Sequence, residues 1–390
     1  MPIFSREELA TRWARVLSNL GDEHECLVVT SFHNSYYLSG LPVLQWGRLS
    51  VTMLFRDGSH VLITPDFEAG AAAENSPIGT VRLYRDSDGP SHPVIADLVA
   101  DVLRERKVTR CALELSGMPA SFLRLLEQRT PEVAFSDGTG AIDVARLVSS
   151  PAELDYAREA SRIVDVGMRR VLELTRPGIS ERELALSGQI AMLEAGTGEY
   201  QLNVSCYLQG GARSEQCHGI PFADPLRAGE LVEVICEAEV EYYQASLERP
   251  VIIGDSCPDE VLRACRVAAE AFDAALAAVR PGARFGDVDR AGREVLLRAG
   301  YDRIPTGAGL VRSIIHHSGG RTELGELRAH NDRLLEPEMV VTVEPWAIVP
   351  GIGGPRHCDV VRVTESGAEQ ITRTPGGVLF SSSFGAVGVA

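Results

Sequence analysis

Apolar residues follow two different periods along the first third of the chain. Short runs of β-branched and large apolar residues, bounded by turn residues, predict strands over residues 26–31, 51–55 and 61–64. Apolar positions at helical spacing predict helices over residues 93–105 and 120–129. Since alternating strands and helices are typical of an α/β domain, we expect residues 1–148 to form one.

A boundary between two domains is predicted near residue 149. Residues 149–153 read Ser-Ser-Pro-Ala-Glu, and this segment contains serines that can cap a helix and a proline suited to its first turn. The helix that follows runs to about residue 175, because its apolar positions share one face: Ala160, Ile163, Gly167, Val171 and Leu174. We expect residues 149–390 to form the second, larger domain.

The second domain contains a weak internal repeat. A helix ends in Arg-Pro-Gly at residues 176–178, and the same arrangement recurs at residues 280–282 after a helix over residues 259–279. Each unit is followed by strand-like segments. A coincidental pair of helix ends is the competing interpretation, because Pro-Gly after a helix is common. We favour a duplication, and therefore an α+β domain with pseudo-twofold symmetry.

Composition indicates an ordinary globular protein. Of 390 residues, 45% are apolar and 24% are charged, and the net charge of −16 would repel nucleic acid and anionic membranes. No apolar run approaches the ~18 residues of a membrane span, and the charged start of the chain lacks the apolar core of a secretory signal. The eight cysteines lack zinc-ligand spacing and are expected to be reduced thiols. These features predict a cytoplasmic protein with a small-molecule ligand.

The densest polar region, residues 231–253, predicts a pair of strands. One face of the first strand is apolar: Val232, Val234, Cys236, Ala238 and Val240. The other face carries glutamates that we expect to be solvated: Glu233, Glu237, Glu239 and Glu241. Glu248 differs, because it lies in an apolar segment beside Arg249 and a buried carboxylate needs a partner. That partner is either Arg249, as a structural ion pair, or a cationic ligand.

His218 lies in a loop between a strand-like segment, residues 201–208, and the acidic strands. A histidine held in a cleft can act first as a base and then as an acid, although a loop histidine is more often a surface residue. The preceding Cys217 offers a nucleophile, but adjacent side chains rarely point at one another. We therefore favour His218 over a thiol mechanism.

Two later segments add polar residues in apolar surroundings. Glu344 is the carboxylate of a buried-looking strand over residues 340–345, and Pro-Arg-His-Cys-Asp at residues 355–359 opens the last clear strand. Each of these side chains has a simpler interpretation as an ion-pair or turn residue. Together with His218 and Glu248 they provide the polar side chains that a lined pocket requires.

These residues resemble the pita-bread family of creatinases, prolidases and aminopeptidases P over essentially the whole chain. Metallopeptidases of that family hold two metal ions with two aspartates, a histidine and two glutamates. Alignment on the tyrosine and arginine of the strand pair, Tyr243 and Arg249, places these residues at the ligand positions: Ile235, Ser246, Leu310, Glu344 and Cys358. Isoleucine and leucine offer a metal no donor, so the resemblance implies neither a metal nor a metallopeptidase.

Within the family the sequence resembles the metal-free branch, the creatinases, which hydrolyse creatine to sarcosine and urea. Residues 30–40 resemble the N-terminal strand and turn of that branch, and Tyr-Tyr-Gln-Ala-Ser-Leu-Glu-Arg-Pro at 242–250 resembles its guanidinium-binding segment. The resemblance makes His218 the catalytic residue. It implies these substrate-binding residues: Glu248, Glu344, Arg321, Arg48, Trp46, Gln244 and Cys358. Three of these positions depart from the creatinase pattern: Gln244 replaces a tyrosine, Trp46 replaces a phenylalanine and Cys358 replaces a histidine.

The resemblance also implies a homodimer whose active site lies at the subunit interface, with Trp46 and Arg48 supplied by the N-terminal domain of the partner. The leading hypothesis is metal-independent hydrolysis of a C–N bond in a small guanidino or amidino carboxylate, with no cofactor. Two glutamates and two arginines balance locally, so the pocket suits a zwitterion. The alternatives are a metal-free lyase, cyclase or hydrolase acting on another zwitterion, and a non-catalytic binding module.

Overall fold

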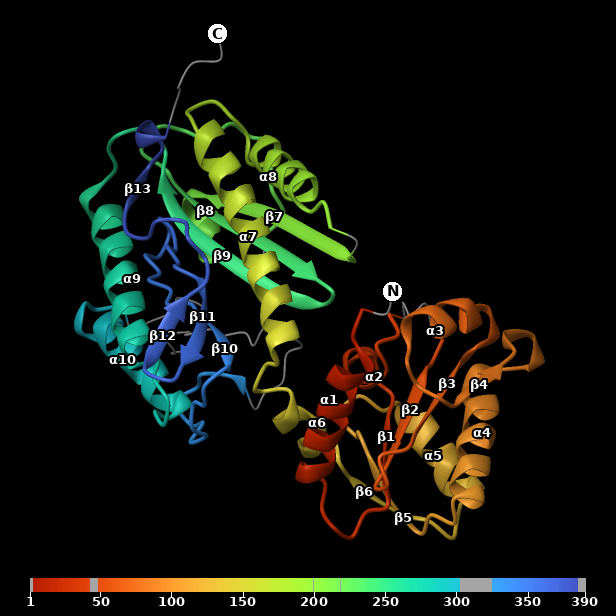
Figure 1. The fold of residues 1–390 in the computed structure, drawn as a ribbon. Coiled ribbons are helices and arrows are strands. Elements are labelled where there is room, and N and C mark those ends of the chain that lie inside the picture. Colours follow the sequence, from red (N-terminus) through yellow and green to blue (C-terminus); the bar gives the residue numbers. More distant parts are fainter. Residues whose placement is uncertain (1–2, 43–47, 199, 218, 302–324, 385–390) are drawn as a thin grey trace. The chain divides into compact units, whose positions relative to one another are not determined.

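The computed structural model describes residues 3–42, 48–198, 200–217, 219–301 and 325–384. The chain divides into two compact units, Met1–Arg146 and Leu147–Ala390, and each unit is described by itself (Figure 1). No described helix is both long enough and apolar enough to cross a membrane.

A six-stranded sheet with the order β4-β3-β2-β1-β5-β6 forms the centre of the N-terminal unit. Its strands are β1 Cys26–Val29, β2 Val51–Phe55, β3 His60–Pro65, β4 Val81–Tyr84, β5 Arg110–Leu113 and β6 Ala134–Asp137. The helices are α1 Arg6–Asn19, α2 Phe32–Ser39, α3 Ala69–Asn75, α4 Ser91–Glu105, α5 Ala120–Arg129 and α6 Thr139–Ala145. Apolar residues of α4 and α5 pack with one face of the sheet, while α1 and α6 lie on the other side (Figure 1).

One segment of this unit differs from the expectation. Residues 32–39 lie within the segment 30–40 that resembles the N-terminal strand and turn of the creatinases, and they form helix α2. The backbone N–H groups of Thr30 and Ser31 donate to the buried carboxylate of Glu114 at 3.0 and 2.9 Å, which fixes the chain just before the helix. Gly40 ends the helix in the left-handed conformation, with φ at 69°.

The C-terminal unit contains two helix pairs, each followed by antiparallel strands. The first pair is α7 Pro151–Leu174 and α8 Glu181–Ala195, and the second is α9 Asp259–Ala278 and α10 Phe285–Arg298. Helices α7 and α8 both begin at a capping box, in which Ser150 pairs with Glu153 and Ser180 pairs with Glu183. The recurrence of this arrangement agrees with the repeat seen in the sequence (Figure 1).

The strands of the C-terminal unit form a four-stranded sheet and a three-stranded sheet. One has the order β13-β9-β8-β7, built from β7 Leu202–Gly210, β8 Leu231–Val240, β9 Tyr243–Ile252 and β13 Leu379–Phe380. The other has the order β10-β11-β12, built from β10 Val340–Val343, β11 Asp359–Thr364 and β12 Gly367–Gln370. The sheets meet at one bridge, where Glu248 and Cys358 exchange backbone hydrogen bonds of 3.1 and 3.3 Å.

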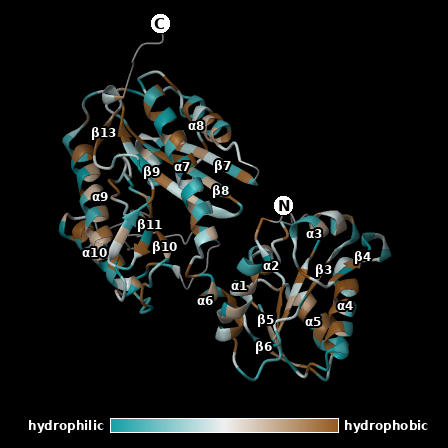
Figure 2. Ribbon diagram, viewed as in Figure 1, coloured by the Kyte–Doolittle hydropathy of each residue, from teal (hydrophilic) through white to brown (hydrophobic). Residues whose placement is uncertain are grey.

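The hairpin of β8 and β9 fixes which side chains share a face. Glu241 and Tyr242 form its two-residue turn with φ at 49° and 66°, so Val240 pairs with Tyr243 and Ile235 with Glu248. The apolar alternation predicted for β8 is confirmed, because all five of its residues lie in the core that α7 helps to form. Hydrophilic and hydrophobic residues are mixed along β7 to β9 (Figure 2). Because the apolar residues of β8 face the core beside α7, the polar residues of β8 lie on the opposite face of the sheet.

Candidate functional site

The polar face of β8 is more deeply buried than the sequence suggests. We expected four solvated glutamates, but Glu233 is fully buried and Glu241 is 2% exposed, while Glu237 and Glu239 are half-buried. The backbone N–H of Arg356 donates to Glu233 at 3.0 Å, and that of Gln201 donates to Glu241 at 2.7 Å. The expectation of a solvated face is therefore wrong for the two glutamates that have these distant partners.

Three carboxyl groups and one guanidinium meet at the junction of the two sheets. Glu233 and Glu248 come from β8 and β9, Glu344 directly follows β10, and Arg356 precedes β11. Glu248 and Glu344 are 4% and 3% exposed, and Arg356 is fully buried. The Arg356 Nε atom lies 3.5 Å from Glu248 Oε2, and the Arg356 Nη1 atom lies 3.4 Å from Glu344 Oε1. We call these four residues the carboxyl cluster.

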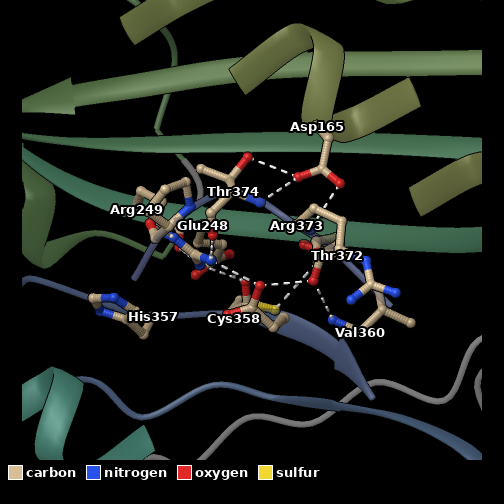
Figure 3. A network of polar contacts seen from close by, with 12 residues as sticks. Asp165, Glu248, Arg249, His357, Cys358, Val360, Thr372, Arg373 and Thr374 are labelled. Atoms are coloured by element: carbon tan, nitrogen blue, oxygen red, sulfur yellow. Dashed lines mark hydrogen bonds and ion pairs between the residues drawn. The ribbon is translucent and has the colours of Figure 1, made fainter. Parts of the chain in front are cut away.

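Arg249 is not the partner of Glu248, contrary to one of the two alternatives considered above. Successive strand residues point to opposite faces, so Arg249 faces away from the carboxyl cluster. Its guanidinium is fully buried, pairs with Asp359 at 2.8 Å and donates to backbone carbonyls of Glu248 and Cys358 (Figure 3). Arg249 therefore fastens the bridge between the sheets, while Arg356 neutralises Glu248.

Burial governs protonation in the cluster. Loss of solvent raises the pKa of Glu344 well above its usual range, the nearby Glu248 raises it further, and Arg356 opposes both. Burial also raises the pKa of Glu248, against the effect of Arg356, and it raises that of Glu233. A hydrogen bond joins the two paired carboxyl groups, raising the pKa of Glu344 and lowering that of Glu248. Glu344 is therefore the protonated donor, and Glu248 is the acceptor.

These shifts predict a pH-dependent stability. The folded chain binds protons at the cluster more tightly than the unfolded chain, so the free energy of unfolding falls as pH rises from ~4.5 through the raised pKa values. Replacing Glu344 by glutamine removes one such group and keeps a donor for Glu248. We expect the Glu344→Gln variant to match the wild type near pH 4.5 and to be more stable by about 1–3 kcal/mol near pH 8.

Urea unfolding at several pH values measures this effect. The matched control is Glu365→Gln, because Glu365 is an exposed glutamate in the turn between β11 and β12. A stability difference between wild type and Glu344→Gln that stays constant across the pH range would contradict the assignment of the proton to the cluster.

Several buried polar atoms around the cluster have no hydrogen-bond partner among the residues that the structure describes. They are Gln209 Oε1, Glu233 Oε1, Glu248 Oε2 and Arg356 Nε. Gln209, Glu233 and Glu248 belong to three neighbouring strands and share the polar face. Since buried polar groups are nearly always paired, the three oxygen atoms in this set indicate a place where a ligand with N–H donors would bind.

Arg356 also ties the loop before His218 to the cluster. Its Nη2 atom donates to the Cys217 carbonyl at 3.1 Å, and its Nη1 atom donates to the Cys217 sulfur at 3.3 Å. Burial raises the pKa of the Cys217 thiol despite the nearby arginine, so the sulfur is a thiol and a poor nucleophile at neutral pH. The structure thus argues against the thiol mechanism, as the sequence reasoning did.

The other predicted site residues fall into two groups. Gln244 lies half-buried on β9, where it donates a hydrogen bond to Glu237 at 3.5 Å and lines a cavity of about 210 Å³. Cys358 is buried and pairs with Glu248 across the bridge between the two sheets. Arg48 forms an ion pair with Asp86 inside the N-terminal unit. Outside the described residues lie Trp46, His218, Leu310 and Arg321.

The sequence gives Arg356 no specific role in the site, although it places residues 355–359 among the polar side chains of a lined pocket. It does not predict Glu233 as a site residue, because Glu233 shares its pattern with glutamates that are half-buried. The one available signal for Arg356 was its position two residues before Cys358, in a segment with few other charges. Nothing in the local pattern of β8 distinguishes Glu233 from Glu237.

The described residues do not suit a metal ion. No three of their His, Cys, Asp or Glu side chains converge in an arrangement that would hold one. Beside Glu248 stand the apolar side chain of Ile235, its pairing partner on β8, and the guanidinium of Arg356, which already supplies a positive charge. A divalent cation would need oxygen or nitrogen donors where these groups lie.

Comparison with known proteins gives matches along most of the chain. The model "Metallopeptidase family M24" matches residues 155–365, and "Creatinase/Prolidase N-terminal domain" matches residues 12–148. A creatinase from Bacillus sp. (strain B-0618) is 26% identical over 390 residues, with 96% of this chain and 93% of that protein covered. An Xaa-Pro dipeptidase from Pyrococcus furiosus is 25% identical over 345 residues, with 87% and 91% covered.

The fold is shared with solved structures. The structure of an Xaa-Pro dipeptidase from Bacillus anthracis superimposes with a TM-score of 0.82 at 22% identity, over 95% of this chain and 99% of that chain. This match confirms the expected two-domain architecture, with a smaller α/β domain before the larger α+β domain.

Proposed function

The chain belongs to metallopeptidase family M24 and has its two-domain pita-bread fold, and from this premise we propose that it is a metal-independent hydrolase of a C–N bond in a small guanidino or amidino carboxylate. Creatine and guanidinoacetate are the first substrates to consider. The observation that carries the proposal is the buried pair of Glu248 and Glu344, in which Glu248 Oε2 accepts no hydrogen bond from any residue that the structure describes.

The donor set supports chemistry without a metal. The family model is named for metallopeptidases, but Ile235, Ser246 and Cys358 stand at three of the positions that the family resemblance implies for metal ligands. Isoleucine has no donor atom, and burial raises the pKa of the Cys358 thiol well above its usual range, which keeps it protonated. The reaction is therefore derived from the side chains of this chain alone.

The cluster suits a planar cation. When ionised, Glu233, Glu248 and Glu344 exceed Arg356 by two negative charges, so an incoming guanidinium would be compensated by charge-assisted hydrogen bonds. Binding of the cation would also draw the proton from Glu344, because a positive charge beside a carboxyl group lowers its pKa. We assign Arg321 and Arg48, the latter from the partner subunit of a homodimer, to the substrate carboxylate.

His218 would supply the acid–base chemistry. As a base it takes a proton from the water whose oxygen attacks the amidine carbon, and as an acid it gives that proton to the departing nitrogen. Protonation of the nitrogen ends its conjugation with the amidine carbon, so the C–N bond breaks and the nitrogen leaves as an amine. The hydrogen bonds from Arg356 to Cys217, the residue before His218, support this assignment.

Hydrolysis of a dipeptide is the second candidate, because the relative from Pyrococcus furiosus is named an Xaa-Pro dipeptidase. A peptide bond is also a C–N bond, and the fold is common to both activities. The two candidates differ in their need for a metal ion and in the charge of the group that faces Glu248 and Glu344.

Urea release from creatine and guanidinoacetate tests the proposal, with an Xaa-Pro dipeptide assayed in parallel with and without Mn²⁺. We expect the purified enzyme to release urea and to keep its activity within about twofold after EDTA treatment, since the described donors do not suit a metal. Strong EDTA inhibition that Mn²⁺ reverses, or turnover of the dipeptide alone, would favour the second candidate instead.

A further inference from the structure

A second cavity, of about 390 Å³, lies in the C-terminal unit away from the carboxyl cluster. It opens between helix α7 and the segment of residues 373–384 that follows β12. Helix α7 contributes Arg169, Leu172 and Glu173, and the later segment contributes Arg373, Pro375 and Phe384. None of these residues belongs to the carboxyl cluster, and the cavity volume falls within the range of small-molecule sites.

The cavity carries two arginines whose guanidinium groups are available to a ligand. Arg169 and Arg373 are exposed, and neither guanidinium has a hydrogen-bond or ion-pair partner among the described residues. The carboxylates at the cavity are already engaged. Glu173 pairs with Arg170 at 3.6 Å, and Asp165 accepts three hydrogen bonds from Arg373 and Thr374.

One wall of the cavity is held rigidly in place. Asp165 on α7 accepts from the backbone N–H groups of Arg373 and Thr374, each at 2.8 Å (Figure 3). From the other side, the buried guanidinium of Arg249 donates to the carbonyls of Thr374 and Pro375 at 2.7 and 2.9 Å. The backbone that carries Arg373 therefore has its position before any ligand arrives, which reduces the ordering that binding requires.

The cavity also offers an apolar surface beside the arginines. Leu172 is buried against the core of the unit, and Phe384 packs at the edge of the same core. With Pro375 they form the part of the lining that would favour a hydrocarbon group. A guanidinium pair next to an apolar patch matches an anion that carries a ring or short chain.

We propose that this cavity is a binding site for a small organic anion, whose carboxylate or phosphate group is held by Arg169 and Arg373 and whose apolar part packs on Leu172, Pro375 and Phe384. The site is independent of the reaction proposed above, because it shares no residue with the carboxyl cluster. The anion is either a carboxylic acid or a phosphate ester, and the two share the same recognition chemistry.

Calorimetric titration of the full chain at low ionic strength tests this site with phenyl phosphate, benzoate, inorganic phosphate and benzyl alcohol. We expect phenyl phosphate or benzoate to bind saturably at one site, more tightly than inorganic phosphate, and benzyl alcohol not to bind. The Arg169→Gln/Arg373→Gln variant should bind the better probe at least tenfold more weakly. Whichever probe binds more tightly identifies the head group as phosphate or carboxylate.

Arg158→Gln is the matched control, because Arg158 is an exposed arginine on α7 whose partner, Asp155, does not line the cavity. Its affinity for the probe should equal that of the wild type, and all three proteins should have the same melting temperature. Unchanged affinity in the double variant, equal losses in the control, or no saturable binding of either aromatic anion would overturn the proposal.

Discussion

Replacing Arg356 by methionine is expected to lower the free energy of unfolding by about 3–5 kcal/mol near pH 8. Methionine keeps much of the side-chain volume but removes the guanidinium that lies 3.5 Å from Glu248 and 3.4 Å from Glu344. The buried carboxylates would then have to lose their charge or remain uncompensated, and both carry a large free-energy penalty in a site without solvent. The backbone hydrogen bond to Glu233 remains.

The loss should depend on pH. Near pH 4.5 the carboxyl groups of the cluster are largely protonated, because burial raises the pKa of each, so the missing guanidinium matters less there. Urea unfolding at both pH values measures the difference. Arg356→Lys should recover part of the stability, since it restores the charge but not the planar fork that reaches Cys217 and both glutamates.

Arg362→Met provides the matched control. Arg362 on β11 also bonds two glutamates, Glu338 and Glu369, but its side chain is 22% exposed and its partners are partly solvated. Ion pairs of that kind contribute about 0–1 kcal/mol. If both arginine variants lose the same stability, or if the loss in Arg356→Met does not change with pH, the carboxyl cluster is not the reason for the effect.

Much of the fold follows from local patterns in the sequence. The serines at 149 and 150 and the proline at 151 predict the start of α7, and the structure places a capping box there, in which Glu153 pairs with Ser150. The alternation of residues 232–240 predicted the apolar face of β8, since a strand that covers a helix must present one set of alternate residues to it. These predictions succeed because the interactions involved lie within a few residues of one another.

The site was harder to predict because its partners are distant in the sequence. Glu233 and Glu237 have the same alternation on β8, but Glu233 is fully buried because the backbone of Arg356 lies over it, 123 residues later in the chain. Strand periodicity tells which face a side chain takes, and does not tell what covers that face. The same periodicity would have excluded Arg249 as the partner of Glu248, because adjacent strand residues face opposite ways.

The two sheets together explain why the site forms where it does. The backbone bridge between Glu248 and Cys358 brings the end of β10 and the start of β11 onto the polar face of β9. Arg249 holds this bridge by donating to the backbone carbonyls of Glu248 and Cys358, and Arg356 places one positive charge beside Glu248 and Glu344. The repeat of helices and strands seen in the sequence thus produces two sheets whose contact assembles the carboxyl cluster, which neither sheet would form alone.

Replacing His218 by alanine is expected to reduce kcat by about 10²–10⁴-fold, if the chain performs the proposed hydrolysis, because general acid–base catalysis contributes an effect of that size. Binding should change little, since Glu248 and Glu344 hold the cationic end of the substrate. The melting temperature should match that of the wild type. His330→Ala is the matched control, because His330 is an exposed loop histidine of the same unit, and it should keep full activity.

Added imidazole gives a sharper test of the role of His218. In the His218→Ala variant, free imidazole supplies the missing base, so urea release should rise with imidazole concentration and follow the protonation of imidazole as pH changes. A variant that merely disturbed the loop after Cys217 would not respond in this way. Retention of more than about a tenth of the wild-type kcat, or a loss that imidazole leaves unchanged at every pH, would mean that another group performs the proton transfer.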